Sequence, residues 1–295
     1  MKVLTFLSFY LLLAMQTSFS QKATFNWEGH RGCRGLMPEN TIPAFLKALD
    51  LGMNTLELDV VISKDRQVVV SHDPYFHPDF SIDPHGKSVA KDPKVVLYQL
   101  NYDEIKRYDV GSNGNPNFPE QEKLKTYKPL LSEVIQVAEA YRMKHNIPLF
   151  WYNIELKSEE KEYDLSQPQP ALFSDLVYNE ISTLLSPNRV VVQSFDFNIL
   201  KYWKKQIEAG KYKKVMLAAL VGNVKGIEKN LEDLGFKPDV YSPYFQLINA
   251  SKVQQLHAMG IQVIPWTINT TEEMKRIQDM GVDGIITDYP NRIPK

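Results

Sequence analysis

This chain has very little cysteine and almost no net charge. Cys33 is the one cysteine among 295 residues, which excludes an intrachain disulfide. The chain carries 34 Lys and Arg against 35 Asp and Glu, a net charge of −1. A nearly neutral chain lacks the general field that attracts proteins to nucleic acids or anionic membranes. We therefore expect no nucleic-acid partner, and we expect functional charge to be confined to a local site.

Long apolar runs are also scarce, and the one that stands out lies at the N-terminus. Lys2 precedes an apolar stretch over residues 3–15, and the small residues Ser18 and Ser20 follow it. A membrane span needs about 20 apolar residues, so the pattern predicts a signal peptide over residues 1–20. An uncleaved anchor is the alternative. Cleavage after Ser20 would leave 295 − 20 = 275 residues, periplasmic or secreted, with no stable membrane insertion.

The remainder alternates short apolar runs with helical patterns, which is typical of parallel strands joined by helices. We expect strands at 25–30, 55–62, 149–155, 190–194, 214–220, 240–243, 262–266 and 284–288. We expect helices between Asn40, the predicted N-cap, and Gly52, and then at 130–145, 171–185, 197–208, 224–234, 251–259 and 271–280.

Eight strands with intervening helices predict an α/β protein with a (β/α)₈ TIM barrel, in which residues 21–295 form a single domain. A doubly wound open sheet is the rival fold, but no glycine-rich phosphate turn follows the first strand. Residues 74–128 follow the second strand and break the alternation. They contain clusters of Pro, Gly and Asn and no clear strand–helix unit, which indicates an inserted segment. The apolar run 68–70 just before it is expected to pair beside the second strand.

Polar side chains stand at the predicted strand ends, where such barrels carry their catalytic groups. Glu57 and Asp59 share one face of the second strand because side chains alternate along a strand. In a barrel lumen they would raise each other's pKa unless a cation kept both ionised. Glu155 and Lys157 repeat this spacing at the end of the third strand. The non-functional alternatives are that Glu57 and Asp59 lie on a solvated strand edge and that Glu155 and Lys157 form a structural ion pair.

Taken together, Glu57, Asp59 and Glu155 offer hard oxygen ligands without soft sulfur or imidazole. This set suits Ca²⁺, Mg²⁺ or Mn²⁺ rather than structural zinc.

The other strand-end residues suit phosphate chemistry. Arg31 and Lys157 are cations suited to a phosphate. His30, at the end of the first strand, and His72, after the run 68–70, can exchange protons near neutral pH. A hard metal ion, two cations and two histidines together indicate a phosphoryl-transfer site.

In order along the chain, several motifs resemble those of the glycerophosphodiester phosphodiesterase family. They are His30-Arg31-Gly32-Cys33-Arg34-Gly35-Leu36-Met37-Pro38-Glu39-Asn40-Thr41, Glu57-Leu58-Asp59-Val60, His72-Asp73, Glu155-Leu156-Lys157, Trp266-Thr267-Ile268-Asn269 and Asp283-Gly284-Ile285-Ile286-Thr287-Asp288-Tyr289-Pro290. The similarity covers nearly all of the mature chain. Two features depart from the family pattern: Arg66 stands where a glycine turn is common, and residues 74–85 lack an Arg-Thr-Thr stretch.

The resemblance implies a barrel enzyme of lipid and glycerol metabolism that cleaves glycerophosphodiesters to glycerol 3-phosphate and an alcohol, with one divalent cation, Ca²⁺ or Mg²⁺. The roles that it implies are acid–base catalysis for His30 and His72, metal binding for Glu57, Asp59 and Glu155, phosphate or substrate contact for Arg31, Lys157 and Trp266, and support of the site for Glu39 and Asn40. The small-molecule diester is then the expected partner. Residues 74–128 fall where the family carries its inserted segment.

Three other functions remain open at this point. A glycosidase could use Glu57 or Asp59 with Glu155 across a sugar and would need no metal. An exported binding protein could hold phosphorylated ligands without cleaving them. A phospholipase-like barrel could act on intact lipids.

Overall fold

The computed structural model describes residues 24–294. The expected signal peptide over residues 1–20 lies outside the described residues. Among the helices of residues 24–294, none combines the length and the apolar character that crossing a bilayer requires.

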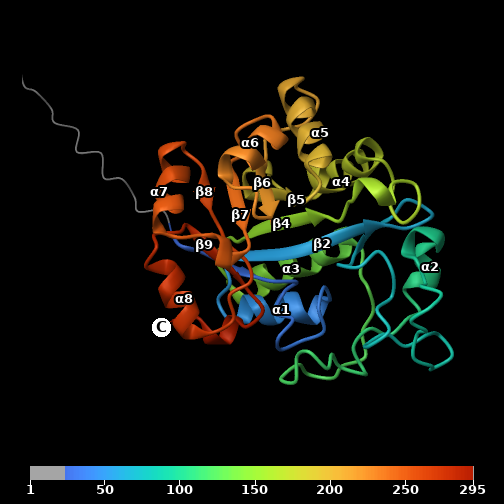
Figure 1. Ribbon diagram of the computed structural model, residues 1–295. Coiled ribbons are helices and arrows are strands. Elements are labelled where there is room, and N and C mark those ends of the chain that lie inside the picture. The colour runs from blue at the N-terminus through green and yellow to red at the C-terminus, as the bar shows by residue number, and fades with distance from the viewer. Residues whose placement is uncertain (1–23, 295) are drawn as a thin grey trace, which may run out of the picture.

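Eight parallel strands form a nearly closed barrel (Figure 1). In chain order they are β1 (Asn26–Gly29), β2 (Thr55–Ile62), β4 (Trp151–Leu156), β5 (Val190–Ser194), β6 (Met216–Val221), β7 (Val240–Pro243), β8 (Gln262–Val263) and β9 (Gly284–Thr287). They are hydrogen-bonded in the order β8-β7-β6-β5-β4-β2-β1-β9. Backbone bonds from Asp283 to Val263, 2.9 Å, and from Ile286 to Pro265, 3.1 Å, bring the two end strands together. The predicted (β/α)₈ barrel is confirmed.

Helices surround the barrel on its outer side (Figure 1). They are α1 (Ile42–Asp50), α3 (Leu131–His145), α4 (Pro170–Leu184), α5 (Phe197–Glu208), α6 (Ile227–Leu234), α7 (Ala250–Ala258) and α8 (Thr271–Gln278), with short 3₁₀ turns η2 (Glu160–Glu162), η3 (Pro187–Arg189), η4 (Phe245–Leu247) and η5 (Pro290–Arg292). On β2 the residues Leu56, Leu58 and Val60 pack into a buried core with residues of α1 and α3. Their alternation therefore turns Glu57 and Asp59 into the lumen.

Three local predictions were wrong in detail. The N-cap of α1 is Thr41 rather than Asn40. Asn40 adopts φ 56°, and its side-chain Nδ2 donates a hydrogen bond to Asp59 instead. The seventh predicted strand, at 262–266, is the short strand β8, which stops at Val263. Ile264 and Trp266 still donate backbone hydrogen bonds to β7, but Pro265 has no N–H to offer the neighbour on the other side. Helix α6 begins at Ile227 rather than at residue 224, after Gly226 with φ 91°.

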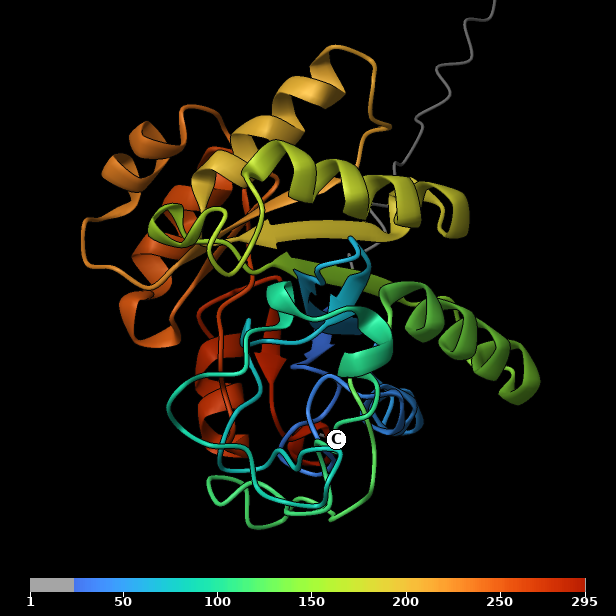
Figure 2. The ribbon, with the colours of Figure 1, turned by 90° about the vertical axis from the view of Figure 1, so that its right-hand side faces the viewer.

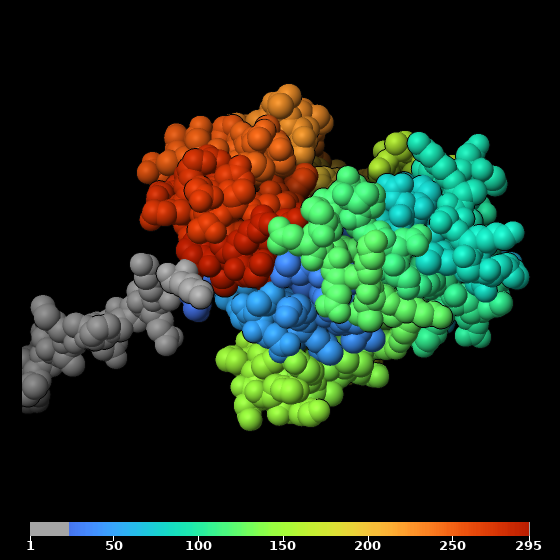
Figure 3. Space-filling model, turned by 90° about the horizontal axis from the view of Figure 1, so that it is seen from below, coloured from blue at the N-terminus to red at the C-terminus, as the bar shows by residue number. Residues whose placement is uncertain are grey.

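The segment after β2 has its own small core. Strand β3 (Val68–Val70) pairs antiparallel with β2, as expected. Residues 74–128 then contain only the short turns η1 (Leu97–Gln99) and α2 (Tyr102–Ile105). Their apolar residues pack with Val61 and Val69 in a separate buried cluster. Figure 2 shows this teal-to-green segment across the face toward the viewer, and Figure 3 shows it beside the blue β1–α1 region.

The barrel lumen has an apolar half and a polar half. The apolar cluster consists of Val191, Ala218, Val240, Ile264 and Ile286. The polar side, from β1, β2, β4 and β5, carries Glu28, Glu57, Asp59, Asn153, Glu155 and Gln193, all of them buried. The buried carboxylates of the strands, Glu28, Glu57, Asp59 and Glu155, therefore lie on one side of the barrel.

Gly32, in the turn after β1, provides a first test of the fold. It has φ 82°, and a methyl group there would lie 2.7 Å from the carbonyl carbon of Ala44 in α1. We expect Gly32→Ala to lower the free energy of unfolding by about 3 kcal/mol, from left-handed strain and overpacking together. Gly52→Ala is the matched control: its φ is 85° but nothing lies within 4 Å, so only about 1 kcal/mol of strain is expected. Urea unfolding measures both, and equal losses would contradict the close packing.

Candidate active site

Three carboxylates meet at the C-terminal end of the barrel, as predicted. Glu57 and Asp59 project from β2, and Glu155 projects from the neighbouring strand β4, whose Glu155 pairs in register with Asp59. One oxygen from each lies within 4.8 Å of the others. The three side chains are 8% exposed or less. Sequence alternation on two adjacent strands is sufficient to produce this cluster.

The partners of the three carboxylates differ. Glu57 accepts hydrogen bonds from the backbone N–H of Arg31, 2.8 Å, and from Gln193 Nε2, 2.8 Å. Asp59 Oδ2 accepts one from Asn40 Nδ2, 2.8 Å. Glu155 forms an ion pair of 2.7 Å with Lys157.

These environments drive the pKa values of the three carboxyls apart. Burial raises the pKa of Glu57 well above its usual value, and the charge of Asp59 adds to this. Burial also raises the pKa of Glu155, to about 7, although Lys157 opposes the change. For Asp59 burial acts in the same direction, but the charges of His72, Arg31 and Lys157 outweigh it and lower the pKa.

The same residues fit a divalent cation. Asp59 Oδ1 is buried and has no hydrogen-bond partner among the described residues. A buried carboxylate oxygen without a partner is costly, and a bound cation would satisfy it. All the ligand atoms are hard oxygens, which Ca²⁺ and Mg²⁺ prefer. Glu57, Asp59 and Glu155 would hold such an ion.

Each of the two predicted histidines is oriented by a carboxylate. His30 Nδ1 lies 2.6 Å from Asp288 Oδ1, and His72 Nδ1 lies 2.9 Å from Asp73 Oδ1. Burial lowers the pKa of His30 to about 4, with Arg34 acting in the same direction and Asp288 against it. Burial, with Arg31 and Lys157, also lowers the pKa of His72. In both rings Nε2 is left without a hydrogen-bond partner among residues 24–294.

The predicted cations lie against the carboxylates. Arg31 NH1 pairs with Glu39, 2.8 Å, and its Nε lies 3.4 Å from Asp59. Lys157 Nζ lies 4.0 Å from Asp59 Oδ1, in addition to its pair with Glu155. Glu39 and Asn40 therefore contact Arg31 and Asp59, respectively. Their supporting roles stay predictions, as do the phosphate-binding roles of the two cations.

Sequence reasoning assigned no role to several residues that the fold brings to the site. Asp288, at the end of β9, accepts from Arg34 Nε, 2.6 Å, and from Asn269 Nδ2, 2.8 Å, besides contacting His30. Its position at a strand end was the signal that could have identified it. Gln193, on the inward face of β5, had the same alternation signal as Glu57.

Lys128 had no such signal, because it ends the irregular segment. Its buried ammonium donates to Ser71 Oγ, 2.7 Å, beside His72. Burial lowers its pKa, against the charge of Asp73.

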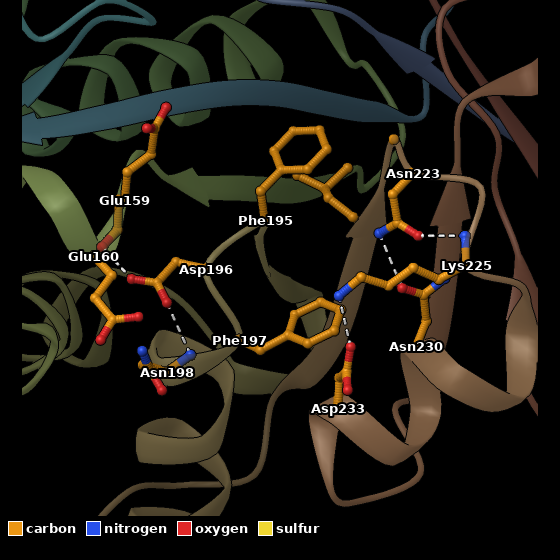
Figure 4. Close-up of a pocket in the computed structure, with 13 residues that line it drawn as sticks. Glu159, Glu160, Phe195, Asp196, Phe197, Asn198, Asn223, Lys225, Asn230 and Asp233 are labelled. Carbon is orange, nitrogen blue, oxygen red and sulfur yellow. Dashed lines mark hydrogen bonds and ion pairs between the residues drawn. The ribbon is translucent and has the colours of Figure 1, made fainter.

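A pocket lies beside Phe195, against which the predicted substrate-contact residue Trp266 packs. The ring of Trp266 meets Phe195 edge-on, with centroids 5.4 Å apart. Lys157 Nζ lies 5.7 Å from the Phe195 ring centroid. Beyond Phe195 a pocket of about 500 Å³ opens, with acidic groups such as Glu160 and Asp233 on its walls (Figure 4).

Glu28, deeper in the lumen, provides a pH test. It is fully buried, and burial raises its pKa from 4.5 to about 7 despite hydrogen bonds from Asn153 and Asn26. The folded state thus keeps a proton that the unfolded chain releases, so this group's stabilisation is complete below pH 4.5 and is lost as the pH rises through 7.

Glu28→Gln should remove that dependence. The stability of the natural chain relative to this variant should fall by about 3 kcal/mol between pH 4.5 and pH 8, at about 1.4 kcal/mol per pH unit. Urea unfolding across this range measures the difference. Parallel curves for the two proteins would contradict it.

Comparison with known proteins points to one family. The family model described as the glycerophosphoryl diester phosphodiesterase family matches residues 30–292. A glycerophosphodiester phosphodiesterase of Caldanaerobacter subterraneus is 30% identical, over 90% of this chain and 94% of that protein. One from Bacillus altitudinis is 29% identical, over 90% and 95%.

Solved structures agree on the fold. A Silicibacter pomeroyi protein that carries the same family name is 28% identical with a TM-score of 0.79, over 92% of each chain. An Oleispira antarctica phosphodiesterase in complex with its product sn-glycerol-3-phosphate is 21% identical, with a TM-score of 0.70 over 91% of this chain and 94% of that one. The second similarity concerns the fold alone.

Proposed function

Because this chain belongs to the glycerophosphoryl diester phosphodiesterase family, we propose that it hydrolyses glycerophosphodiesters to glycerol 3-phosphate and an alcohol with one divalent cation, Ca²⁺ or Mg²⁺. The observation that carries the proposal is the buried carboxylate cluster of Glu57, Asp59 and Glu155, together with two histidines, His30 and His72, that are each oriented by a carboxylate.

The cation would be held by the three carboxylates, where it would withdraw electron density from a phosphate oxygen and lower the pKa of a nearby hydroxyl. Arg31 and Lys157 add positive charge against the phosphate, which favours the charge that develops in the transition state. Both also keep Asp59 ionised, as its lowered pKa reflects.

His30 is suited to accept the first proton. Its lowered pKa keeps the ring neutral at neutral pH, and a Nδ1–H donated to Asp288 leaves Nε2 as the basic nitrogen. In the route that we favour, His30 takes the proton of a glycerol hydroxyl, whose oxygen attacks phosphorus. The bond from phosphorus to the other alcohol breaks, and His72, in its protonated form, gives that alcohol a proton. Water then opens the cyclic phosphate: the water gives one proton to His72, and His30 returns its proton to the glycerol oxygen that leaves phosphorus, so both histidines regain their starting states.

Direct attack by water is the alternative route. Transient cyclic glycerol phosphate in a rapid-quench experiment supports the first route. Hydrolysis of a diester that lacks the adjacent hydroxyl would show that the cyclic route is not required.

The pocket beyond Phe195 is suited to one of the two alcohol portions of the diester, because Phe195 lines the pocket and its ring centroid lies 5.7 Å from Lys157 Nζ. The three other functions considered above are separated from this one by experiment. The test is release of glycerol 3-phosphate by the purified chain from a panel of glycerophosphodiesters, before and after chelation. Ligand binding without release would favour a binding protein. Loss of activity on chelation would disfavour a glycosidase, whose chemistry needs no metal, and activity on micellar lipid alone would favour a phospholipase.

We also propose that residues 1–20 direct export, so that the mature enzyme is periplasmic or secreted. N-terminal sequencing of the protein recovered outside the cytoplasm would then begin at Gln21.

A further inference from the structure

A continuous chain of hydrogen bonds runs through the polar half of the lumen to Glu57. Glu57 Oε1 accepts from Gln193 Nε2, 2.8 Å, and Gln193 Oε1 accepts from Asn153 Nδ2, 3.1 Å. The same Asn153 Nδ2 donates to Glu28 Oε2, 2.7 Å. Glu28 Oε1 in turn accepts from Asn26 Nδ2, 2.7 Å. These bonds link β5, β4 and β1 to the carboxylate on β2.

The chain is sealed from solvent. Glu28, Asn153, Gln193 and Glu57 are 0%, 3%, 1% and 1% exposed. Water therefore offers no ready substitute for a broken link, and an unpartnered polar group there is costly.

The direction of each bond is fixed by the next one. If the Gln193 amide turned over, its oxygen would face the Glu57 carboxylate and its nitrogen would face Asn153 Nδ2, giving two repulsive contacts. If Asn153 turned over, its oxygen would face both the Glu28 carboxylate and the Gln193 oxygen. An accepting carboxylate at Glu28 therefore keeps the Gln193 N–H pointed at Glu57, and this hydrogen bond fixes one oxygen of the Glu57 carboxylate in place.

We propose that Glu28, Asn153 and Gln193 are positioning residues for the metal site, which hold the Glu57 carboxylate in the orientation that accepts a divalent cation. This inference rests on the proposed metal site. Outer hydrogen-bond partners of metal ligands elsewhere change metal affinity by about 10–100-fold when they are removed. None of the three residues is among the proposed ligands, so their effect must pass through Glu57.

The test is calorimetric titration of the full chain with Ca²⁺ alone after chelator treatment. The titration is carried out at pH 8, above the pKa of about 7 that burial gives Glu28. Gln193→Met keeps the side-chain length but removes the donor to Glu57, and we expect a loss of Ca²⁺ affinity of about 10–100-fold. Glu28→Met removes the far end of the chain, and we expect a smaller loss in the same direction. Glu28→Gln still offers one oxygen to Asn153 and should retain most of the affinity.

Two comparisons separate positioning from general destabilisation. Ser194→Ala alters the next residue of β5, equally buried, whose hydroxyl donates to Leu156 O, 2.9 Å; its Ca²⁺ affinity should be unchanged. In the double variant, Glu28→Met should add nothing to the loss caused by Gln193→Met, because its effect passes through Gln193. Asn153→Leu breaks the same link from β4 and replaces Glu28→Met if that variant does not fold.

Each result bears on the proposal. If the losses of Ca²⁺ affinity in Gln193→Met and Glu28→Met were additive, or if both variants kept the affinity of the natural chain, the positioning role of the hydrogen-bond chain would be overturned. The proposed metal site would remain intact. If the natural chain bound neither Ca²⁺ nor Mg²⁺, the metal site itself would be overturned, and so would the positioning role of the hydrogen-bond chain.

Discussion

Replacing His30 with alanine should lower kcat by about 10²–10⁴-fold, and replacing His72 should do the same. Each ring is held by a carboxylate at one nitrogen, and its other nitrogen has no hydrogen-bond partner among the described residues. Removing either ring leaves a proton transfer to water. The measurement is steady-state release of glycerol 3-phosphate, with KM determined alongside kcat.

The chain contains a matched control for these substitutions. His257 also contacts a carboxylate, with Nε2 lying 2.8 Å from Asp283 Oδ2. This pair lies on the surface, because the His257 side chain, on α7, is 39% exposed. His257→Ala should leave kcat unchanged. Unchanged turnover in both His30→Ala and His72→Ala would remove the acid–base assignment.

The pH profile should carry the signature of His30. Because its pKa is lowered to about 4, the basic form persists well below the usual histidine range. With saturating metal to keep Glu57 and Glu155 ionised, the acidic limb of kcat/KM should therefore lie below pH 6. The Asp288→Asn variant, which loses the charge that raises the pKa of His30, should move that limb no higher. A limb near 6.5 in the natural enzyme would contradict the assignment.

Asp59→Asn should cause a large loss of affinity for the divalent cation. Asp59 is the carboxylate held ionised by its neighbours, and one of its oxygens has no hydrogen-bond partner among residues 24–294. Asparagine keeps the shape but removes the charge, so Ca²⁺ and Mg²⁺ affinity should fall by about 100-fold or more, since even outer partners contribute about 10–100-fold. Calorimetry of the chelated protein gives the affinity, and activity should return in part with excess metal.

Glu232→Gln serves as the control for the loss of one acidic charge. Glu232 is 73% exposed on α6 and pairs only with Lys229 among the described residues. Equal metal affinity in the Asp59→Asn variant and the natural chain would refute the ligand assignment, as would full activity of the natural chain in EDTA.

Alternating patterns predicted the parts of the structure that depend on local sequence. The bounds of β2 and β7 were predicted to the residue, because both are short segments rich in residues with high strand propensity and are bounded by turn residues. The clustering of Glu57, Asp59 and Glu155 followed from the same alternation. Prediction failed where backbone chemistry overrides the pattern, as at Pro265 and Gly226.

Contacts between distant segments could not be predicted in this way. Asn40 fits an N-cap by residue type, yet its amide is used by Asp59, which only the packing of α1 against β2 brings near. Asp288 stands 258 positions from His30 and meets it because β9 pairs with β1. Lys128 reaches Ser71 only after residues 74–128 have folded back on β3. In each case the partner is set by the packing of segments that are distant in the sequence, and for Asp288 and His30 that packing is the closure of the barrel between β9 and β1.

The division of the carboxylates between β2 and β4 has a consequence for biogenesis. These adjacent strands are separated along the chain by the whole irregular segment and α3, so their pairing requires a long loop to close, which slows folding. When β2 has left the ribosome, Glu155 on β4 has not yet been synthesised, and the nascent chain therefore carries an incomplete set of the proposed ligands. If the proposed cation is bound, its loading would follow translation of β4, and a translocated chain would take its ion from the compartment in which it folds.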